Sequence, residues 1–292
     1  MSKKHPIVAI TGSSGAGTST VKTAFEHLFW RLKINAAVIE GDSYHAFDRK
    51  EMAEKIKNGD GDRRALSHFG PRANLFAELE NTFKTYSKTG KGKIRKYLHN
   101  EEEAEPYKQA PGTFTKWENM PANTDLLFYE GLHGGVIDKE QKVNVAQWVD
   151  LLVGVVPIVN LEWIQKIHRD CAERGYSAEA VTHTILRRMR DYVGYITPQF
   201  SQTHINFQRV PTVDTSNPFI ARDIPTPDES FIIIRFRNPK GVDFPYLLNM
   251  LHDSFMSRPN SIVVPGGKMT FAMELVFGPI LEEMIASKKK AK

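Results

Sequence analysis

The sequence predicts an α/β fold, with a mixed, mainly parallel sheet, helices on both of its faces and added antiparallel strands. Short continuous apolar runs alternate with amphipathic stretches, as in buried parallel strands joined by crossover helices. A glycine-rich loop joins the first apolar run to the first amphipathic stretch. The apolar runs in the last third of the chain have looser spacing, which indicates antiparallel strands at an edge.

The first apolar run, HPIVAITG at 5–12, predicts a buried strand, and STVKTAFEHLFWRLK at 19–33 has helical periodicity. Three further runs end in Gly, Pro or polar residues and predict parallel strands at 34–42, 124–132 and 149–159. The looser runs lie at 204–216, 229–237 and 261–267. The polar stretch from about 58 to 123 predicts helices and long loops inserted beside the site. No change in composition marks a linker, so we expect one domain over residues 1–292.

The composition is typical of a soluble globular protein, with 41% hydrophobic and 25% charged residues. The longest apolar run, which starts at Leu151, is too short to cross a bilayer as a helix, so we expect no membrane association. The single cysteine, Cys171, excludes an intrachain disulfide and favours a cytoplasmic location. The formal net charge of +5 favours anionic partners.

The glycine-rich segment matches a phosphate-binding loop except at one position. Glycines let the backbone fold back so that several N–H groups point inward, and the following helix adds the positive end of its dipole. Thr18 stands where such loops carry a lysine, and Ser19 stands where they carry a hydroxyl ligand for Mg²⁺. The alternative is a plain Gly/Ser turn. The residues expected to bind ATP are Gly12, Ser13, Ser14, Gly15, Ala16, Gly17, Thr18, Ser19 and Thr20.

Two acidic residues end apolar strands at the edge where this loop lies. Glu130 follows LLFY and is placed to hold Mg²⁺ directly or through water. Asp42 ends the second strand, and a kinase needs such a carboxylate to accept the proton of the acceptor hydroxyl. His45 and Arg49 follow closely and are placed to bind a phosphate already on the acceptor. The alternative is a solvated Glu, a turn Asp and two surface cations.

Lys166, Asp170 and Arg174 recur at four-residue intervals and therefore share one helix face, with Arg169 beside them. Salt bridges on a surface helix would explain the series as well. In a chain that lacks the loop lysine, however, these cations are available to the γ-phosphate. We expect Lys166 to replace that lysine, with Arg169 and Arg174 as alternatives. The next helical segment adds cations at a lid edge or an effector site: Arg187, Arg188 and Arg190.

In order along the chain, GDSYHAFDR, SHFGP, GTFTKWENMP, LLFYEGLHGG, KIHRDCAERGYS and PQFSQTHINFQRVPTVDTSNPF resemble motifs of the phosphoribulokinase family. The run RDCAERG is also similar to the lid of uridine kinases, which share the P-loop kinase fold. The resemblance covers most of the chain and implies transfer of the γ-phosphoryl group of ATP to the 1-hydroxyl of ribulose 5-phosphate, for carbon fixation. It implies that Asp42 is the base and that Glu130 and Asp170 serve the metal and the transition state. The residues implied to hold the sugar phosphate are His45, Arg49, Arg169 and Arg174.

Plant members of the family carry a loop lysine and paired cysteines that switch the enzyme by thiol–disulfide exchange. This chain has Thr18 and one cysteine, so we expect no such redox control. The pattern resembles the bacterial class, which implies a homo-octamer that NADH activates and AMP inhibits. The arginines expected in effector sites are Arg31, Arg187, Arg188, Arg235 and Arg258.

Three other functions compete with this interpretation. A kinase of uridine or pantothenate acts on an acceptor without phosphate, which would leave the cluster around His45 and Arg49 unexplained. A GTPase-type switch is disfavoured because no Asn-Lys-x-Asp motif occurs, and the Asp-x-x-Gly at Asp191–Gly194 follows a helical pattern. A nucleic-acid binder would account for the positive charge, but the cations are dispersed among acids without an aromatic-interleaved stripe. We therefore expect ATP, Mg²⁺ and a sugar phosphate as ligands, and no nucleic acid.

Overall fold

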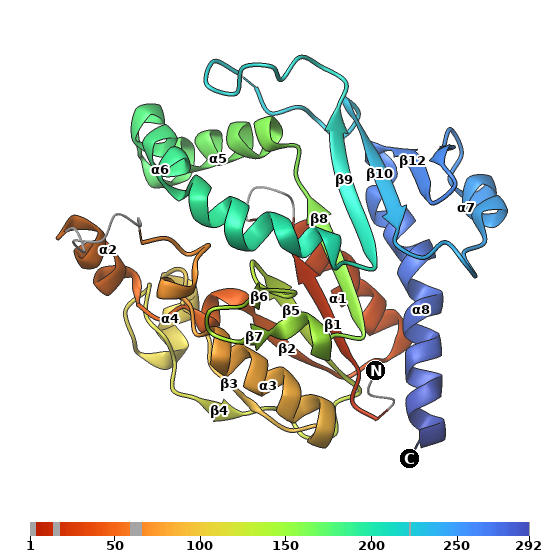
Figure 1. The fold of residues 1–292 in the computed structure, drawn as a ribbon, viewed down its shortest axis with the longest axis horizontal. Helices are drawn as coiled ribbons and strands as arrows, with labels where there is room; N and C mark the ends of the chain where they lie inside the picture. The colour runs from red at the N-terminus through yellow and green to blue at the C-terminus, as the bar shows by residue number, and fades with distance from the viewer. Residues whose placement is uncertain (1–3, 14–17, 59–65, 222, 292) are drawn as a thin grey trace.

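An eight-stranded sheet runs through the centre of the molecule in the computed structural model (Figure 1). The structure describes residues 4–13, 18–58, 66–221 and 223–291, apart from the side chains of Thr18, Ser19, Arg174 and Ala291. Across the sheet, the strands are β11 (Phe255–Arg258), β12 (Ser261–Pro265), β10 (Ser230–Phe236), β9 (Ile205–Pro211), β8 (Leu151–Val156), β1 (Ile7–Thr11), β5 (Leu126–Gly131) and β2 (Ala36–Glu40).

The strands from β9 to β2 are parallel, and β10, β12 and β11 add an antiparallel edge. The prediction of a mainly parallel sheet with added antiparallel strands is therefore confirmed. The prediction of an antiparallel strand at 204–216 was correct for one neighbour only: β9 is antiparallel to β10 but parallel to β8. Two helices lie between β8 and β9, and a crossover of that length returns the chain to the same end of the sheet.

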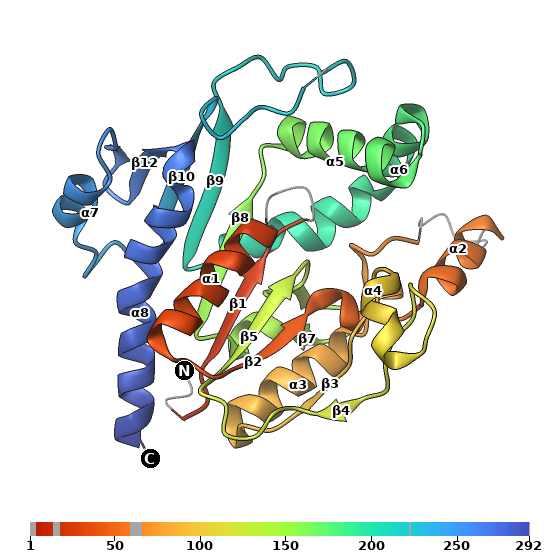
Figure 2. The same cartoon turned by 180° about the vertical axis from the view of Figure 1, so that it is seen from behind.

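Helices cover both faces of the sheet, as predicted (Figures 1 and 2). Val8 and Ile10 of β1 pack in one core with α1 (Thr18–Leu32), α7 (Phe244–Met250) and α8 (Met269–Ala291). The alternate residues of the same strand, Ile7 and Ala9, pack on the other face against α3 (Phe76–Thr89). Since side chains alternate along a strand, a strand that is apolar at successive residues, as β1 is from Ile7 to Ile10, fits a sheet buried on both faces.

The polar stretch at 58–123 contains more core structure than the sequence suggests. Four side chains of α3 are buried, at the spacing of one helix face: Phe76, Leu79, Phe83 and Tyr86. Gly90, with φ of 67°, ends this helix in the left-handed conformation. Short elements make up the rest of this side of the molecule: α2 (Arg49–Lys57), α4 (Glu101–Ala104), the ribbon of β3 (Lys93–Ile94) with β4 (Glu118–Asn119), and the ribbon of β6 (Ile137–Asp138) with β7 (Val143–Asn144).

Two helices, α5 (Val159–Arg174) and α6 (Ala178–Asp191), lie beyond the end of the sheet at which β8 finishes (Figure 1). They pack on each other through a small apolar cluster that includes Ile167 and Ile185, with Cys171 partly buried at its side. A π-helical turn and a 3₁₀ turn then lead from α6 back to β9. Among the described residues, no helix has both the length and the apolar character needed to cross a bilayer.

Candidate active site

The carboxyl ends of the parallel strands enclose a cavity of about 440 Å³. The chain leaves β1 for β2 and β5 on one side and later reaches β8 on the other, so this cavity lies where the strand order reverses. Its wall brings together residues from α1, the ends of β2 and β5, the 58–123 segment and α5: Gly12, Lys22, Thr23, Glu26, Glu40, Gly41, Asp42, His99, Glu103, Glu130, Gly131, Leu132 and Arg169. The cavity therefore contains the start of the predicted phosphate loop and both predicted strand-end acids.

Asp42 lies in a 3₁₀ turn, Gly41–Tyr44, that follows β2 directly. Its carboxylate is partly exposed, 3.5 Å from Nε2 of His45 and 3.9 Å from Nε2 of His99. Gly41 makes the position possible, because a Cβ there would meet the Gly131 Cα at 2.9 Å. The turn thus packs against the end of β5 and presents Asp42 to the cavity.

Glu130 lies on this cavity wall with Glu40 next to it, since the two are register partners on β5 and β2. Lys22 of α1 forms an ion pair with Glu40. Carboxylate oxygens are ligands that Mg²⁺ accepts, so the residues present fit this cation. Within the described ranges, no three side chains form a metal site by themselves.

Three histidines are buried behind Asp42. The rings of His45 and His68 lie 4.1 Å apart between centroids, and Nε2 of His133 is 2.9 Å from the carbonyl oxygen of His68. Burial lowers the pKa of His45 and His68 to about 3 and that of His133 to about 4. His45 is therefore neutral at physiological pH, and the alternative of a surface cation at this position is wrong.

Lowering the pH from 7 to 5 is expected to reduce the free energy of unfolding by about 2 kcal/mol for each of these three histidines. In the unfolded chain each ring takes up a proton as the pH falls below about 6.5. The folded chain keeps the rings neutral down to about pH 4. The unfolded state then binds more protons, so acid favours it. Urea unfolding at a series of pH values measures the slope.

His68→Gln should remove about one third of that slope, because it removes one of three similar groups. The matched control is His252→Gln, since His252 is exposed and its substitution should leave the slope unchanged. Equal slopes in the wild type and His68→Gln would contradict the assignment of buried neutral rings.

Arg49 begins α2 and lies close to this group. Its Nη2 donates to the carbonyl oxygen of His99 at 2.8 Å, and its guanidinium also lies beside Tyr97, whose ring is 6.1 Å from that of His45. Asp48 caps α2 with a capping box and so fixes where Arg49 starts the helix. The structure thus brings Asp42, His45 and Arg49 together, as the sequence predicts.

Lys166 and Asp170 lie one turn apart on α5 and are in contact, with Nζ 2.5 Å from Oδ2. Arg169 holds the other oxygen of Asp170, from Nε at 3.1 Å and Nη2 at 3.0 Å. Burial lowers the pKa of Lys166, and the Asp170 carboxylate opposes that shift. The predicted shared face is present for this pair, whereas the side chain of Arg174 lies outside the described residues.

The first turn of α5 contacts Ser13, which lies near the start of the predicted phosphate loop. Glu162 is buried beside Ser13, and the Tyr192 hydroxyl donates a hydrogen bond to its carboxylate at 2.8 Å. Desolvation raises the pKa of Glu162. Lys166 follows Glu162 by one helical turn, so α5 carries a cation within a turn of the loop. The loop residues Ser14–Gly17 and the side chains of Thr18 and Ser19 lie outside the described residues.

The five arginines predicted as effector residues occupy four different places. Arg235 and Arg258 flank Ser261 of β12, on strands β10 and β11. Arg31 pairs with Glu274 of α8, on the opposite face of the sheet from Arg235. The remaining two are on α6: Arg187 donates to the Leu66 carbonyl, whereas the charge of Arg188 acts on His45, His68 and Lys166.

Arg188 therefore lies with the predicted sugar-phosphate residues rather than with Arg235 and Arg258. Other cavity residues that the sequence did not single out include Lys22, Glu40 and His99. The sequence could have indicated Lys22, because it follows Thr18 by four residues. A cation one helical turn after the loop lies on the same helix face and close to the loop. His99 carried no signal, because only the fold brings it to Asp42.

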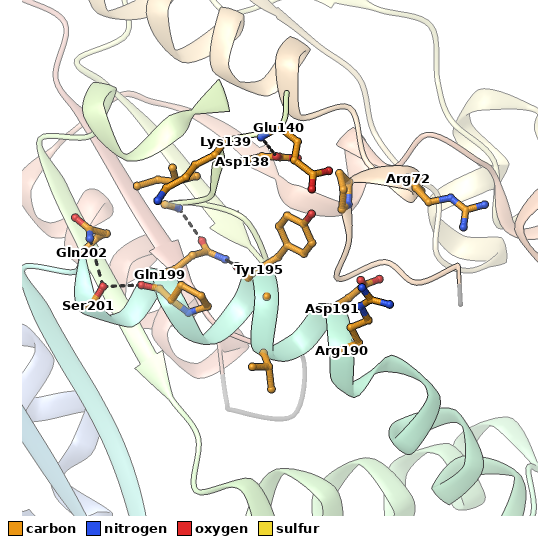
Figure 3. A pocket seen from close by; sticks show the side chains of 16 residues that line it. Arg72, Asp138, Lys139, Glu140, Arg190, Asp191, Tyr195, Gln199, Ser201 and Gln202 are labelled. Atoms are coloured by element: carbon orange, nitrogen blue, oxygen red, sulfur yellow. Dashed lines mark hydrogen bonds between the residues drawn. The ribbon is translucent and has the colours of Figure 1, made fainter. Parts of the chain in front are cut away.

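A second hollow, of about 580 Å³, lies on the side of the π-helical turn Tyr192–Ile196 (Figure 3). Gln199 lines it and forms four hydrogen bonds: its oxygen accepts from the Thr11 hydroxyl and the Gly135 N–H, and its nitrogen donates to the carbonyls of Leu132 and Tyr195. One amide thus joins the end of β1, the loop after β5 and the π-helical turn. None of the residues predicted for catalysis lines this hollow.

Known proteins similar to this chain cover its whole length. The family model described as Phosphoribulokinase / Uridine kinase family matches residues 7–216. The chain is 62% identical over 294 residues to the chromosomal phosphoribulokinase of Cupriavidus necator, covering 100% of this chain and 99% of the relative. It is 58% identical over 292 residues to the phosphoribulokinase of Nitrobacter vulgaris, covering 100% of each. The solved phosphoribulokinase from Rhodobacter spheroides has a TM-score of 0.89 and 54% identity, covering 99% of this chain and 100% of that one.

Proposed function

The chain belongs to the phosphoribulokinase / uridine kinase family, and on that premise we propose that it transfers the γ-phosphoryl group of ATP to O1 of ribulose 5-phosphate. The observation that carries this proposal is that Gly12 of the phosphate loop and Asp42 face one cavity. The nucleotide and a hydroxyl-bearing acceptor can therefore meet in that space. The product, ribulose 1,5-bisphosphate, places the reaction in the Calvin cycle.

In this proposal Asp42 accepts the proton of the acceptor hydroxyl as O1 bonds to the γ-phosphorus. The bond from that phosphorus to the β,γ-bridging oxygen breaks, and ADP leaves with its electron pair. When bound with the nucleotide, Mg²⁺ would neutralise charge on the phosphates, and the residues that would hold it are Glu130 and Glu40 on the cavity wall together with the predicted ligands Ser19 and Asp170. Lys166 provides the cation that the loop lacks, and Asp170 orients it.

In this proposal, the residues around Asp42 bind the phosphate that the acceptor already carries. His45 offers a neutral N–H, and Arg49, Arg169 and Arg188 offer charge. We assign Arg188 to this group together with Arg174, which the family resemblance includes. Uridine and pantothenate carry no phosphate for these side chains to bind, and a nucleotide switch has no phosphorylated acceptor.

The test is ADP release from ATP and Mg²⁺ with and without ribulose 5-phosphate, alongside uridine and pantothenate. We expect rapid release with ribulose 5-phosphate alone and a product that carries two phosphates by ³¹P NMR. Equal turnover of uridine would replace the proposal with a nucleoside kinase. ATP hydrolysis that no acceptor stimulates would replace it with a nucleotide-dependent switch.

His45→Asn and Arg49→Ala are each expected to raise KM for ribulose 5-phosphate by about 10- to 100-fold, with kcat changed much less. A hydrogen bond to a charged group contributes about 1.5–3 kcal/mol, and a remote phosphate is held equally in the ground and transition states. Steady-state kinetics at saturating ATP measure both constants. An unchanged KM in both variants would place these residues outside the acceptor site.

The family resemblance also supports finer proposals about assembly and regulation. We propose a cytoplasmic homo-octamer that NADH activates and AMP inhibits, without thiol–disulfide control. Arg235 and Arg258, on either side of Ser261, supply one pair of cations for an anionic effector, and Arg31 lies on a different face. Sedimentation with each nucleotide, and rates with and without it, test these proposals.

A further inference from the structure

Arg95 binds the backbone of the turn that carries Asp42. It follows β3 directly, in the ribbon outside the main sheet. Its Nε donates to the carbonyl oxygen of Ser43 at 2.7 Å, and its Nη2 donates to that of His45 at 2.7 Å. Carbonyls at the end of a short helix lack partners within the helix, so one guanidinium satisfies two of them.

Two aromatic rings hold this guanidinium in place. Its Cζ lies 3.8 Å from the ring centroid of Phe114 and 4.8 Å from that of Trp117. Trp117 also meets the ring of Tyr44, at 5.5 Å between centroids, and the Tyr44 hydroxyl donates to Thr82. Stacking on these rings fixes the plane of the guanidinium group. A fixed plane lets its two N–H donors reach two separate carbonyl oxygens at the same time.

The chemistry of this contact differs from that of an ordinary surface arginine. Arg95 is half-buried, and within the part of the chain that the structure describes it forms no salt bridge with a carboxylate. The Asp42 side chain is 40% exposed. The position of its carboxylate therefore depends on the backbone of the turn. A displacement of about 1 Å at a reacting group can cost 10²-fold in rate.

We propose that Arg95 is a positioning residue that holds the 41–45 turn, and with it Asp42 and His45, in the geometry needed for phosphoryl transfer. This proposal rests on the proposed function for its effect on rate, but not for its effect on the turn. It also gives the β3–β4 ribbon a role: the ribbon brings Arg95 and Trp117 to the catalytic turn from strands that are not part of the main sheet.

The experiment compares Arg95→Ala and Arg95→Lys with Arg237→Met. Arg237 is a matched control because its Nη1 also donates to a carbonyl, that of Gln202 at 3.1 Å. It lies at the amino end of β9, away from the cavity. We expect kcat to fall about 10²-fold in Arg95→Ala and less in Arg95→Lys, which keeps one donor. KM for ATP should change less than about threefold, whereas KM for ribulose 5-phosphate should rise, because His45 moves with the turn.

Two further measurements separate positioning from stability. Methylguanidinium should restore part of kcat in Arg95→Ala, because it can refill the place between Phe114 and Trp117. Hydrogen exchange should accelerate by about tenfold or more at the amides of His45 and Ala46, which donate to Asp42 and Ala73 in the wild type. Arg237→Met should show neither effect.

Each outcome decides the proposal. A wild-type kcat in Arg95→Ala, measured on a wild type that uses ribulose 5-phosphate, would overturn it. So would a loss of kcat that occurs with a lowered Tm, unchanged exchange at 45–46 and no rescue. If the wild type did not use ribulose 5-phosphate, the proposed function would fail, and the exchange measurement alone would then show whether Arg95 holds the turn.

Discussion

Asp42→Asn is expected to lower kcat by about 10²–10⁴-fold while the binding of both substrates changes little. The amide has nearly the shape of the carboxylate but cannot accept a proton. The two imidazole Nε2 atoms 3.5 and 3.9 Å from Asp42 belong to His45 and His99, and an imidazole ring cannot supply the negative charge of the lost carboxylate. Single-turnover kinetics with ribulose 5-phosphate measure the chemical step.

Glu26→Gln is the comparison for this variant, because it removes a carboxylate from the same cavity wall. Loss of negative charge alone would affect both variants similarly, whereas loss of a base affects Asp42→Asn alone. We expect a loss of less than about threefold in Glu26→Gln, as for most substitutions away from the reacting atoms. If Asp42→Asn kept most of its kcat, Asp42 would have no part in the chemistry.

Lys166→Met is expected to reduce kcat by more than about tenfold, while the affinity for ATP falls much less. During transfer, negative charge moves from the γ-phosphoryl oxygens to the leaving oxygen, and a cation must be near it. Thr18 cannot supply that cation. Lys166 can, because its helix contacts the loop at Ser13 through Glu162 and its own Nζ is held by Asp170.

The double variant Thr18→Lys with Lys166→Met should recover part of the lost rate, since the added lysine returns the charge to the loop. Lys22→Met is a useful comparison, because Lys22 is a second cation on the cavity wall. An intact kcat in Lys166→Met together with a loss in Lys22→Met, Arg169→Met or Arg174→Met would assign the missing charge to that other residue. Isothermal titration with a non-hydrolysable ATP analogue measures the affinity in each variant.

The sequence predicted the parallel part of the sheet because local patterns determine it. β1, β5 and β8 are apolar on both faces over most of their length, which predicts burial on both sides, and the glycine loop after β1 predicts which edge binds phosphate. The direction of β9 could not be predicted, because its pattern suits either orientation and the α5–α6 crossover decides it. The buried face of α3 was missed because its four apolar residues are diluted by polar neighbours.

The candidate site was predictable where its residues follow a strand or share a helix face. Asp42 closely follows the end of β2, Glu130 lies near the end of β5, and Lys166 and Asp170 are one turn apart on α5, so local patterns indicate each of these positions. His99 and Arg95 reach the site by long-range packing that no local pattern records. The neutrality of His45 depends on burial, which the fold alone creates.

Gln199 joins parts of the molecule that protein synthesis produces at different times. It accepts a hydrogen bond from Thr11, which is 188 residues earlier in the chain. At about 5–20 residues per second, the ribosome needs roughly 10–40 s to make that interval. During this time Thr11 lacks its hydrogen bond to Gln199. Helices α5 and α6 are synthesised late in the same interval. The hydrogen bonds through which Gln199 joins the end of β1 to the loop after β5 can therefore form only after α5 and α6 have been synthesised.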